Sequence, residues 1–234
     1  MCRSTRVNRT AVHQIETVSR IDIYGVSETT GMIGIPGAVD IEVQRRIWWL
    51  ADRFKDYPGA REVVPGMNNL TVELDPAAAD LEKLLRDLTA AWSESKAVTL
   101  RSRRIEILVE YGGTAGPDLD EVARHVQLSA AEVVRLHSGG EYSVLFLGFL
   151  PGFAYLGGLD KRLAMPRRAQ PRLAVPAGSV GIGGEQTGIY PSASPGGWRL
   201  IGRTASRLFD PSLSPPSLLL PGDTVKFVDV GERT

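Results

Sequence analysis

Hydrophobic and polar positions repeat with two different periods in the first part of the chain. Residues 20–26 (RIDIYGV) follow the two-residue period of a strand, with Ile21 and Ile23 on one face. After a turn-rich piece, residues 39–54 (VDIEVQRRIWWLADRF) follow the helical period, and Asp40 is placed to cap the helix. The apolar stripe of this predicted helix consists of Val43, Ile47, Leu50 and Phe54.

Two adjacent tryptophans, Trp48 and Trp49, lie on this predicted helix. Neighbouring positions on a helix point about 100° apart, so at most one of the two rings faces the core squarely. Packing in the core or against another subunit is therefore favoured over stacking on a ligand.

The pattern continues with a strand, a helix and a further strand. Residues 69–74 (NLTVEL) alternate as a strand, and PGMNN supplies turn residues before it. Residues 76–95 predict a helix with Pro76 in its first turn and an apolar stripe of Leu81, Leu84, Leu85, Leu88 and Trp92. Residues 103–112 (RRIEILVEYG) predict the closing strand. The order β-(β)-α-β-α-β over about residues 20–110 predicts an α/β sandwich of ferredoxin-like type.

The second half combines two short helices with many short strands. Residues 116–138 predict the two helices, and Ser129 with Glu132 forms a capping box at the start of the second. From Gly148 to Gly202 the chain contains twelve of its 25 glycines and no helical periodicity longer than one turn. Residues 218–230 (LLLPGDTVKFVDV) predict two strands joined by a Pro-Gly-Asp turn. This pattern predicts a β-barrel.

These patterns predict an α+β chain of two domains. We expect a ferredoxin-like domain at residues 20–104 and a barrel domain at residues 105–234, with the boundary near Ser95–Arg104. Residues 1–19 contain three arginines but lack the apolar core of a secretory signal. We expect them to form a disordered tail or to result from an over-long start; an amphipathic transit peptide is the alternative.

Composition and charge narrow the class of protein. The 234 residues are 43% hydrophobic and 23% charged, which is ordinary for a globular protein. Lys plus Arg and Asp plus Glu both number 27, so no overall field indicates nucleic acid or membrane as a partner. The single cysteine, Cys2, excludes an internal disulfide framework and fits a reducing compartment, so we expect a cytoplasmic protein without membrane spans.

Common catalytic motifs fail on spacing. The glycine-dense stretch VGIGGEQTGIYP (Val180–Pro191) raises the question of a phosphate loop, but the chain contains no Gly-Lys pair for a P-loop. A dinucleotide fingerprint would need glycine where Gln186 stands, and Ala177 occupies the first glycine position of a nucleophile elbow around Ser179. The stretch is better explained by sharply turning strands.

The histidines give no metal site, since none of the three has a partner at ligand spacing. His137 is the most interesting of them, because it ends a predicted helix just before the barrel. Capping the helix and acting in catalysis are about equally favoured for it.

The region from Asp160 to Arg207 is rich in cations. It contains eight basic residues and only two acidic ones, in a chain that is neutral overall. Guanidinium groups bind carboxylates and phosphates through paired hydrogen bonds, so an anionic ligand or an acidic partner surface is expected here. A solvated rim is the alternative for any one arginine. The basic residues are Lys161, Arg162, Arg167, Arg168, Arg172, Arg199, Arg203 and Arg207.

Several long segments together resemble one bacterial family, that of the 5-oxoprolinase B subunit, also called KipI or allophanate hydrolase subunit 1. The resemblance covers about residues 20–230 and is most specific at Pro166–Thr204. The segments that carry it are GPDL, LHSGGEYSVLFLGFLPGFAYLGGLD, PRRAQPRLAVPAGSVGIGGEQTGIYPSASPGGWRLIGRT and PGDTVKFV, with PGMNN and QRRIWWLA in the first half.

The resemblance implies a ferredoxin-like domain followed by a cyclophilin-like β-barrel. It also implies two partners, a homologous-barrel C subunit and an A subunit, with which 5-oxo-L-proline is cleaved to L-glutamate at the expense of ATP. Mg²⁺ is expected to accompany the ATP. Family members also include the carboxyltransferase part of urea carboxylase and an inhibitor of a sporulation histidine kinase, so both remain alternatives. We expect this chain to contribute half of a shared active site and to be inactive without its partners.

Within this resemblance, motif membership and side-chain chemistry select the candidate site residues. His137 is the candidate acid/base or substrate ligand, and no metal ligands are expected. The candidate substrate-binding residues are Asn68, Asn69, Arg167, Arg172, Gln186, Thr187, Tyr190 and Arg203.

Overall fold

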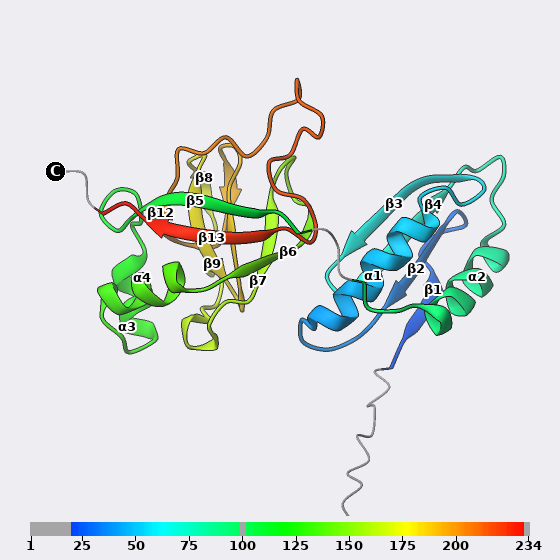
Figure 1. Ribbon diagram of the computed structural model, residues 1–234, viewed down its shortest axis with the longest axis horizontal. Coiled ribbons are helices and arrows are strands. Elements are labelled where there is room, and N and C mark those ends of the chain that lie inside the picture. Colours follow the sequence, from blue (N-terminus) through cyan, green and yellow to red (C-terminus); the bar gives the residue numbers. More distant parts are fainter. Residues whose placement is uncertain (1–19, 99–101, 232–234) are drawn as a thin grey trace, which may run out of the picture.

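The computed structural model describes residues 20–98 and 102–231, which form an N-terminal α/β unit and a β-barrel (Figure 1). The tail predicted at residues 1–19 and part of the expected domain boundary lie outside the described residues. The N-terminal unit consists of β1 (Asp22–Gly25), β2 (Thr30–Gly34), α1 (Ile41–Phe54), β3 (Ala60–Gly66), β4 (Asn69–Leu74) and α2 (Leu81–Glu94).

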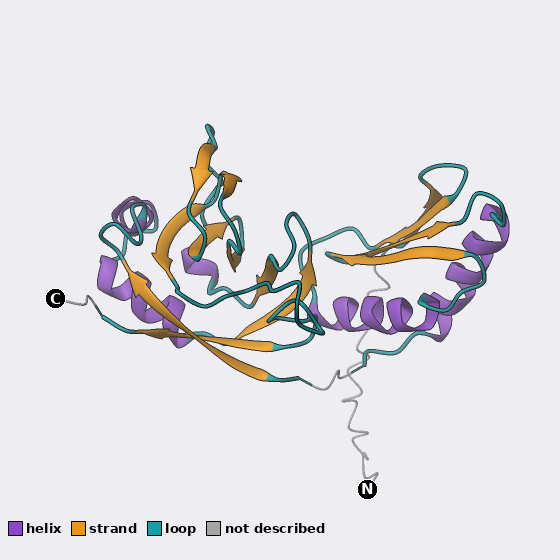
Figure 2. Cartoon of the chain, turned by 90° about the horizontal axis from the view of Figure 1, so that it is seen from above, coloured by secondary structure: helices purple, strands orange, loops and turns teal. Residues whose placement is uncertain are grey.

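The N-terminal strands form an antiparallel sheet in the order β1-β2-β4-β3. Alternation along β4 buries Leu70, Val72 and Leu74 on one face. Both helices pack on that face, α1 against β3 and β4 and α2 against β1 and β2 (Figure 2). If β1 is counted last, the order of the elements is β-α-β-β-α-β. This is the ferredoxin-like arrangement that the sequence predicts, with β1 in the place of the final strand.

The helix starts show how local capping sets the boundaries. Asp40 caps α1 as predicted, because its carboxylate accepts hydrogen bonds from the backbone N–H of Glu42 at 2.8 Å and Val43 at 3.4 Å. The prediction that Pro76 lies in the first turn of α2 is wrong. Asp80 caps that helix instead, and Pro76 belongs to a separate turn before it.

In the second unit, seven strands close into a barrel in the order β10-β7-β6-β13-β5-β12-β9, and β9 pairs with β10 to complete the ring. Short strands β8 (Arg172–Val175) and β11 (Ser194–Gly196) pair with each other outside it. The barrel strands are β5 (Arg104–Tyr111), β6 (Tyr142–Leu147), β7 (Ala154–Gly157), β9 (Ser179–Gly183), β10 (Gln186–Ile189), β12 (Arg199–Arg203) and β13 (Thr224–Asp229). The predicted fold class, α+β with a C-terminal barrel, is confirmed.

Three helical segments accompany the barrel. α3 (Leu119–His125) packs on β12, and α4 (Ala130–Gly139) packs on β13. A single 3-10 turn, η1, covers Lys161–Leu163. The predicted cap of α4 is confirmed, since the Ser129 hydroxyl accepts a hydrogen bond from the Glu132 N–H at 3.1 Å.

Two predicted strands are placed differently in the structure. Residues 103–112 do not close the N-terminal sheet, because β5 runs parallel to β13 from Arg104–Thr224 to Val109–Asp229 inside the barrel. The prediction of two strands at the C-terminal end is also wrong. Only β13 forms there, while Leu218–Leu220 follow an isolated bridge between Phe209 and Ser217.

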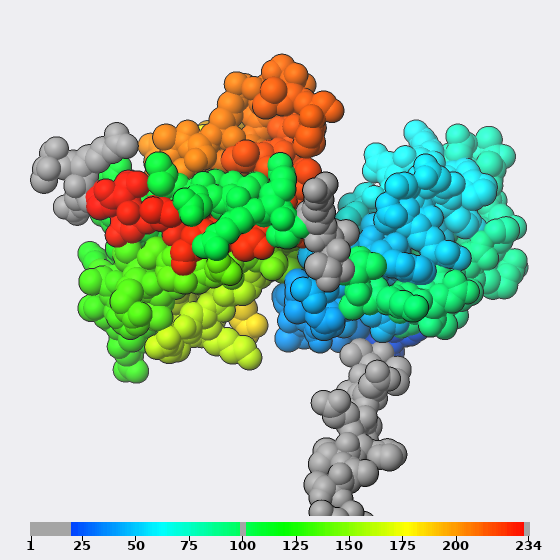
Figure 3. Space-filling view, in the orientation of Figure 1, coloured from blue at the N-terminus to red at the C-terminus, as the bar shows by residue number. Residues whose placement is uncertain are grey.

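The two units contact each other through α1 and β6. The Trp48 indole N–H donates to the Leu145 carbonyl at 2.8 Å, and the Gln44 amide donates to the same carbonyl at 3.2 Å. Both side chains are buried. Figure 3 shows two lobes that meet along one narrow side. No helix among residues 20–98 and 102–231 is long and apolar enough to cross a membrane.

Candidate functional site

The glycines of the β9–β10 hairpin make room for one tryptophan. Side chains that alternate with these glycines, such as Ile182 and Ile189, point into the barrel core. On the outer face, a Cβ atom at Gly183 would lie 2.5 Å from the indole nitrogen of Trp198, and one at Gly188 would lie 3.1 Å from its ring. The glycines therefore let the Trp198 ring lie directly on the hairpin backbone.

Trp198 forms one wall of a small pocket on the outside of the barrel, which we call the aromatic pocket. Phe153 meets the Trp198 ring edge-on with centroids 5.5 Å apart, and it meets Tyr190 in the same way at 5.3 Å. The cavity has a volume of about 290 Å³. Its lining residues are Phe149, Phe153, Tyr155, Arg167, Arg168, Pro171, Tyr190, Pro195, Gly196, Gly197 and Trp198.

Phe149 has an unusual backbone conformation at this pocket. Its φ of 66° lies in the left-handed region, which bulky residues rarely adopt, and its side chain is 59% exposed. Its ring meets those of Phe153 and Tyr190 edge-on. A large apolar side chain held out to solvent in a strained conformation is a feature that clusters at ligand sites.

One cation at the pocket has no acidic partner. The guanidinium carbon of Arg167 lies 5.9 Å from the centre of the Trp198 ring, and none of the described carboxylates forms an ion pair with it. Burial raises the pKa of Tyr155 and Tyr190, although the positive charge of Arg167 acts in the opposite direction on both. At neutral pH the pocket thus combines a free guanidinium with two protonated phenols.

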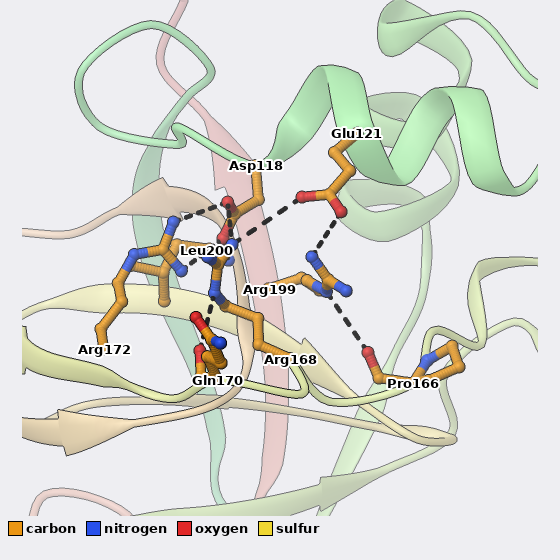
Figure 4. A network of polar contacts seen from close by, with 8 residues as sticks. All are labelled: Asp118, Glu121, Pro166, Arg168, Gln170, Arg172, Arg199 and Leu200. Atoms are coloured by element: carbon orange, nitrogen blue, oxygen red, sulfur yellow. Dashed lines mark hydrogen bonds and ion pairs between the residues drawn. The ribbon is translucent and has the colours of Figure 1, made fainter.

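A buried carboxylate fixes the segment that carries Arg167. The Asp118 carboxylate accepts two hydrogen bonds from the Arg172 guanidinium, at 2.6 and 2.9 Å, and a third from the Leu200 backbone N–H at 2.7 Å (Figure 4). Arg168 approaches the same carboxylate at 3.5 Å. Residues 168 and 172 are therefore tied to the start of α3, and Arg167 lies next to one of these anchors.

The expected anion-binding patch stays a prediction, and the structure shows which of its basic residues have partners within the chain. Of the eight basic residues between positions 160 and 207, five form ion pairs within the chain, and three of their carboxylate partners, Asp118, Glu121 and Asp210, lie outside that window. Arg172 in particular is engaged by Asp118. The five paired residues are Arg162, Arg168, Arg172, Arg199 and Arg207.

His137 and Thr187 lie together inside the barrel, away from the aromatic pocket. The Thr187 hydroxyl donates to the Gly181 carbonyl at 2.9 Å, so it accepts from the Nε2–H of His137 at 2.9 Å. Nδ1 then accepts from the Tyr111 hydroxyl at 2.7 Å. Burial lowers the pKa of His137 to about 3, so the ring is neutral. The acid/base role stays a prediction, whereas these surroundings are those of a structural histidine.

The remaining predicted residues do not gather at one place. Asn68, with φ of 53°, occupies the β3–β4 turn, where its amide donates to the Ala38 carbonyl, and Asn69 bonds to the Met67 carbonyl. Gln186 begins β10, and Arg203 donates to the Ala177 carbonyl on the surface. Of the predicted residues, the structure thus brings only Arg167 and Tyr190 together in the pocket.

Sequence reasoning missed most of the aromatic wall. Phe153 and Tyr155 were visible only as an excess of aromatic residues in FLGFLPGFAYL, and Trp198 gave no periodic signal. The usable signal was the glycine-dense hairpin, since strands that lack side chains on one face leave space for a large ring from elsewhere.

The chain belongs to the family described as carboxyltransferase domain, subdomain C and D, whose model matches residues 21–219. It is similar to the B subunit of 5-oxoprolinase from Escherichia coli O157:H7, with 53% identity over 212 residues, 90% of this chain and 97% of that protein.

Two solved structures are also similar to this chain. PH0987 from Pyrococcus horikoshii is 44% identical with a TM-score of 0.55, and the match covers 91% of this chain and 99% of that one. TTHA0988 is 38% identical with a TM-score of 0.74 over 88% of this chain. This chain spans only 40% of the TTHA0988 chain, so that protein contains a large additional part.

Proposed function

We propose that this chain is the B subunit of an ATP-dependent 5-oxoprolinase, which converts 5-oxo-L-proline, ATP and water to L-glutamate, ADP and phosphate. The observation that carries the proposal is the 53% identity to a 5-oxoprolinase B subunit, over 97% of that protein. The match thus extends over nearly the whole length of that B subunit.

The charges of the aromatic pocket indicate which ligand of the complex it fits. Mg²⁺-bound ATP requires several cations and carboxylate ligands for the metal. The pocket lining offers one free guanidinium and contains no Asp or Glu, so its residues do not fit this nucleotide. The aromatic pocket therefore fits a small substrate better than Mg²⁺-bound ATP.

Partner subunits follow from the same proposal. The complex would contain a C subunit with a homologous barrel and an A subunit. The longer TTHA0988 chain, of which more than half lies outside the match, supports the idea that further domains work beside this one.

The proposal is tested by reconstitution. Purified chain is combined with candidate A and C subunits, and ADP and L-glutamate are measured with and without 5-oxoproline. We expect turnover that depends on 5-oxoproline and disappears when this chain is left out. Turnover by this chain alone would contradict the shared site. No turnover, with urea-dependent activity beside a biotin carrier or stable binding only to a histidine kinase, would favour the two alternative functions.

A further inference from the structure

We propose that the aromatic pocket binds the lactam substrate itself, with Arg167 pairing with the carboxylate and the flat, uncharged ring lying against Trp198. This inference rests on the proposed function and deepens it, because it assigns a substrate site to this chain. The ligand class is a small monocarboxylate with a compact planar body.

Charge matching is the first argument. Arg168 also lines the pocket and has ion-pair partners, since the carboxylates of Asp118 and Glu121 lie 3.5 and 3.9 Å from it, although Arg172 and Arg199 bind the same two carboxylates at 2.6 and 2.5 Å. Arg167 is the cation of the lining that forms no ion pair with any of the described carboxylates. One guanidinium matches one carboxylate, whereas a triphosphate would bring about four negative charges to a site with one free cation.

Size and shape are the second argument. A volume of about 290 Å³ falls at the lower end of ligand pockets, which range from roughly 300 to 1,000 Å³. The walls are rings set nearly at right angles, with Phe153 at 83° to Trp198 and at 80° to Tyr190. Such walls favour a flat ring of few atoms over an extended chain.

Hydrogen-bond donors are the third argument. The amide oxygen of a lactam accepts hydrogen bonds and needs donors that remain protonated. Burial raises the pKa of Tyr155, so its hydroxyl keeps its proton at neutral pH and can donate to that oxygen. Gly196 and Gly197 in the lining bring backbone, not side chains, to the other wall.

Rigidity of the support is the fourth argument. Arg167 is exposed, yet the segment around it is anchored through Arg168 and Arg172 to the buried carboxylate of Asp118. An anchored backbone reduces the conformational freedom that binding must remove, so even one ion pair contributes measurably.

The test uses the reconstituted complex and separates KM from kcat. Arg167→Ala is compared with wild type and with Arg61→Ala, which removes an exposed arginine from the N-terminal sheet. We expect Arg167→Ala to raise the KM for 5-oxoproline about tenfold or more, with little change in kcat or in the KM for ATP. Arg167→Lys keeps the charge and should give a smaller increase.

The outcomes distinguish this inference from the proposed function. If the wild-type complex is active and Arg167→Ala behaves like Arg61→Ala, the pocket is not the lactam site and the proposed function stands. A rise in the KM for ATP instead would make the pocket a nucleotide site and overturn the inference. If the wild-type complex does not cleave 5-oxoproline, the proposed function falls and the inference falls with it. Circular dichroism checks that each variant is folded.

Discussion

At the scale of single residues, the barrel interior contains a fully satisfied polar chain of Tyr111, His137 and Thr187. Each hydroxyl and each ring nitrogen has a partner, and the chain ends at the Gly181 carbonyl. This set of hydrogen bonds requires a neutral imidazole. If Nδ1 of His137 were protonated, it could no longer accept the hydrogen bond that the Tyr111 hydroxyl donates. The network therefore stabilises the barrel while His137 stays uncharged.

Stability should consequently depend on pH through His137. Its pKa is about 3 in the folded chain against 6.5 for an ordinary histidine, so the unfolded state binds an extra proton between these values. The contribution of the neutral His137 ring to the free energy of unfolding is therefore present above about pH 6.5, and it is lost as the pH falls toward 3. We expect a loss of about 2 kcal/mol in the free energy of unfolding between pH 7.5 and 5.

His137→Gln, which bonds without titrating, should flatten this pH dependence in urea unfolding at pH 7.5 and pH 5. NMR of the wild-type imidazole gives an independent measure, since its signals should not shift between pH 5 and 8. A His137 signal that titrates near pH 6.5, matched by a kcat profile of the complex with the same pKa, would instead support the acid/base role.

Asp118 is the second residue with a testable structural role. Its buried carboxylate neutralises Arg172 and orients the segment with Arg167. Asp118→Asn should lower the free energy of unfolding by about 3 kcal/mol, because it leaves a guanidinium without its buried partner. It should also raise the KM for 5-oxoproline in the complex.

The control for this change is Glu94→Gln, which breaks the exposed pair between Arg53 and Glu94 and should cost less than about 1 kcal/mol. Chemical denaturation of both variants gives the comparison. Equal effects would show that the Asp118 network contributes no more than a surface ion pair.

At the scale of elements, both faces of the β9–β10 hairpin make packing contacts. One face completes the barrel core, and the bare glycine face supports Trp198. Gly183→Ala would place a methyl group 2.5–2.7 Å from a buried, rigid indole ring, so the ring must shift out of the pocket wall.

We expect Gly183→Ala to lower stability by about 1–3 kcal/mol and to weaken 5-oxoproline binding. Gly139→Ala, at the end of α4 with no atom within 4 Å of the added carbon, is the matched control and should be neutral. Thermal unfolding and the KM of the complex are measured for both. An unchanged KM for 5-oxoproline in Gly183→Ala would show that the hairpin does not affect substrate binding in the pocket.

The same elements show what a sequence can predict. Local signals were sufficient for α1 with its Asp40 cap and for α4 with its Ser129 cap, because each cap depends on residues within three positions. They were insufficient for β5, whose pairing with β13 joins residues 120 positions apart. The partner of Arg172 could not be predicted for the same reason, since the carboxylate that engages it comes from Asp118, 54 positions earlier.

At the scale of the whole molecule, the contact between the two units includes buried polar groups. Gln44 is completely buried; its amide donates to the Leu145 and Gly66 carbonyls and accepts from the Asn68 N–H. Trp48 adds the second donor to Leu145. One residue of the barrel thus receives two side chains of α1, beside the contact that β3 makes with β6.

Removing both donors should uncouple the two units. The double variant Gln44→Leu, Trp48→Phe keeps apolar volume but leaves the Leu145 carbonyl without either side-chain donor, and it also leaves the Asn68 N–H unpaired. Each buried group left unpaired costs about 1–3 kcal/mol. We expect one calorimetric unfolding transition for the wild-type chain and two for the double variant, with a larger radius of gyration of the double variant in X-ray scattering. Trp49→Phe changes the neighbouring ring, which packs on the N-terminal core, and should keep one transition. A double variant that unfolds in one transition at the wild-type midpoint would mean that the units are coupled elsewhere.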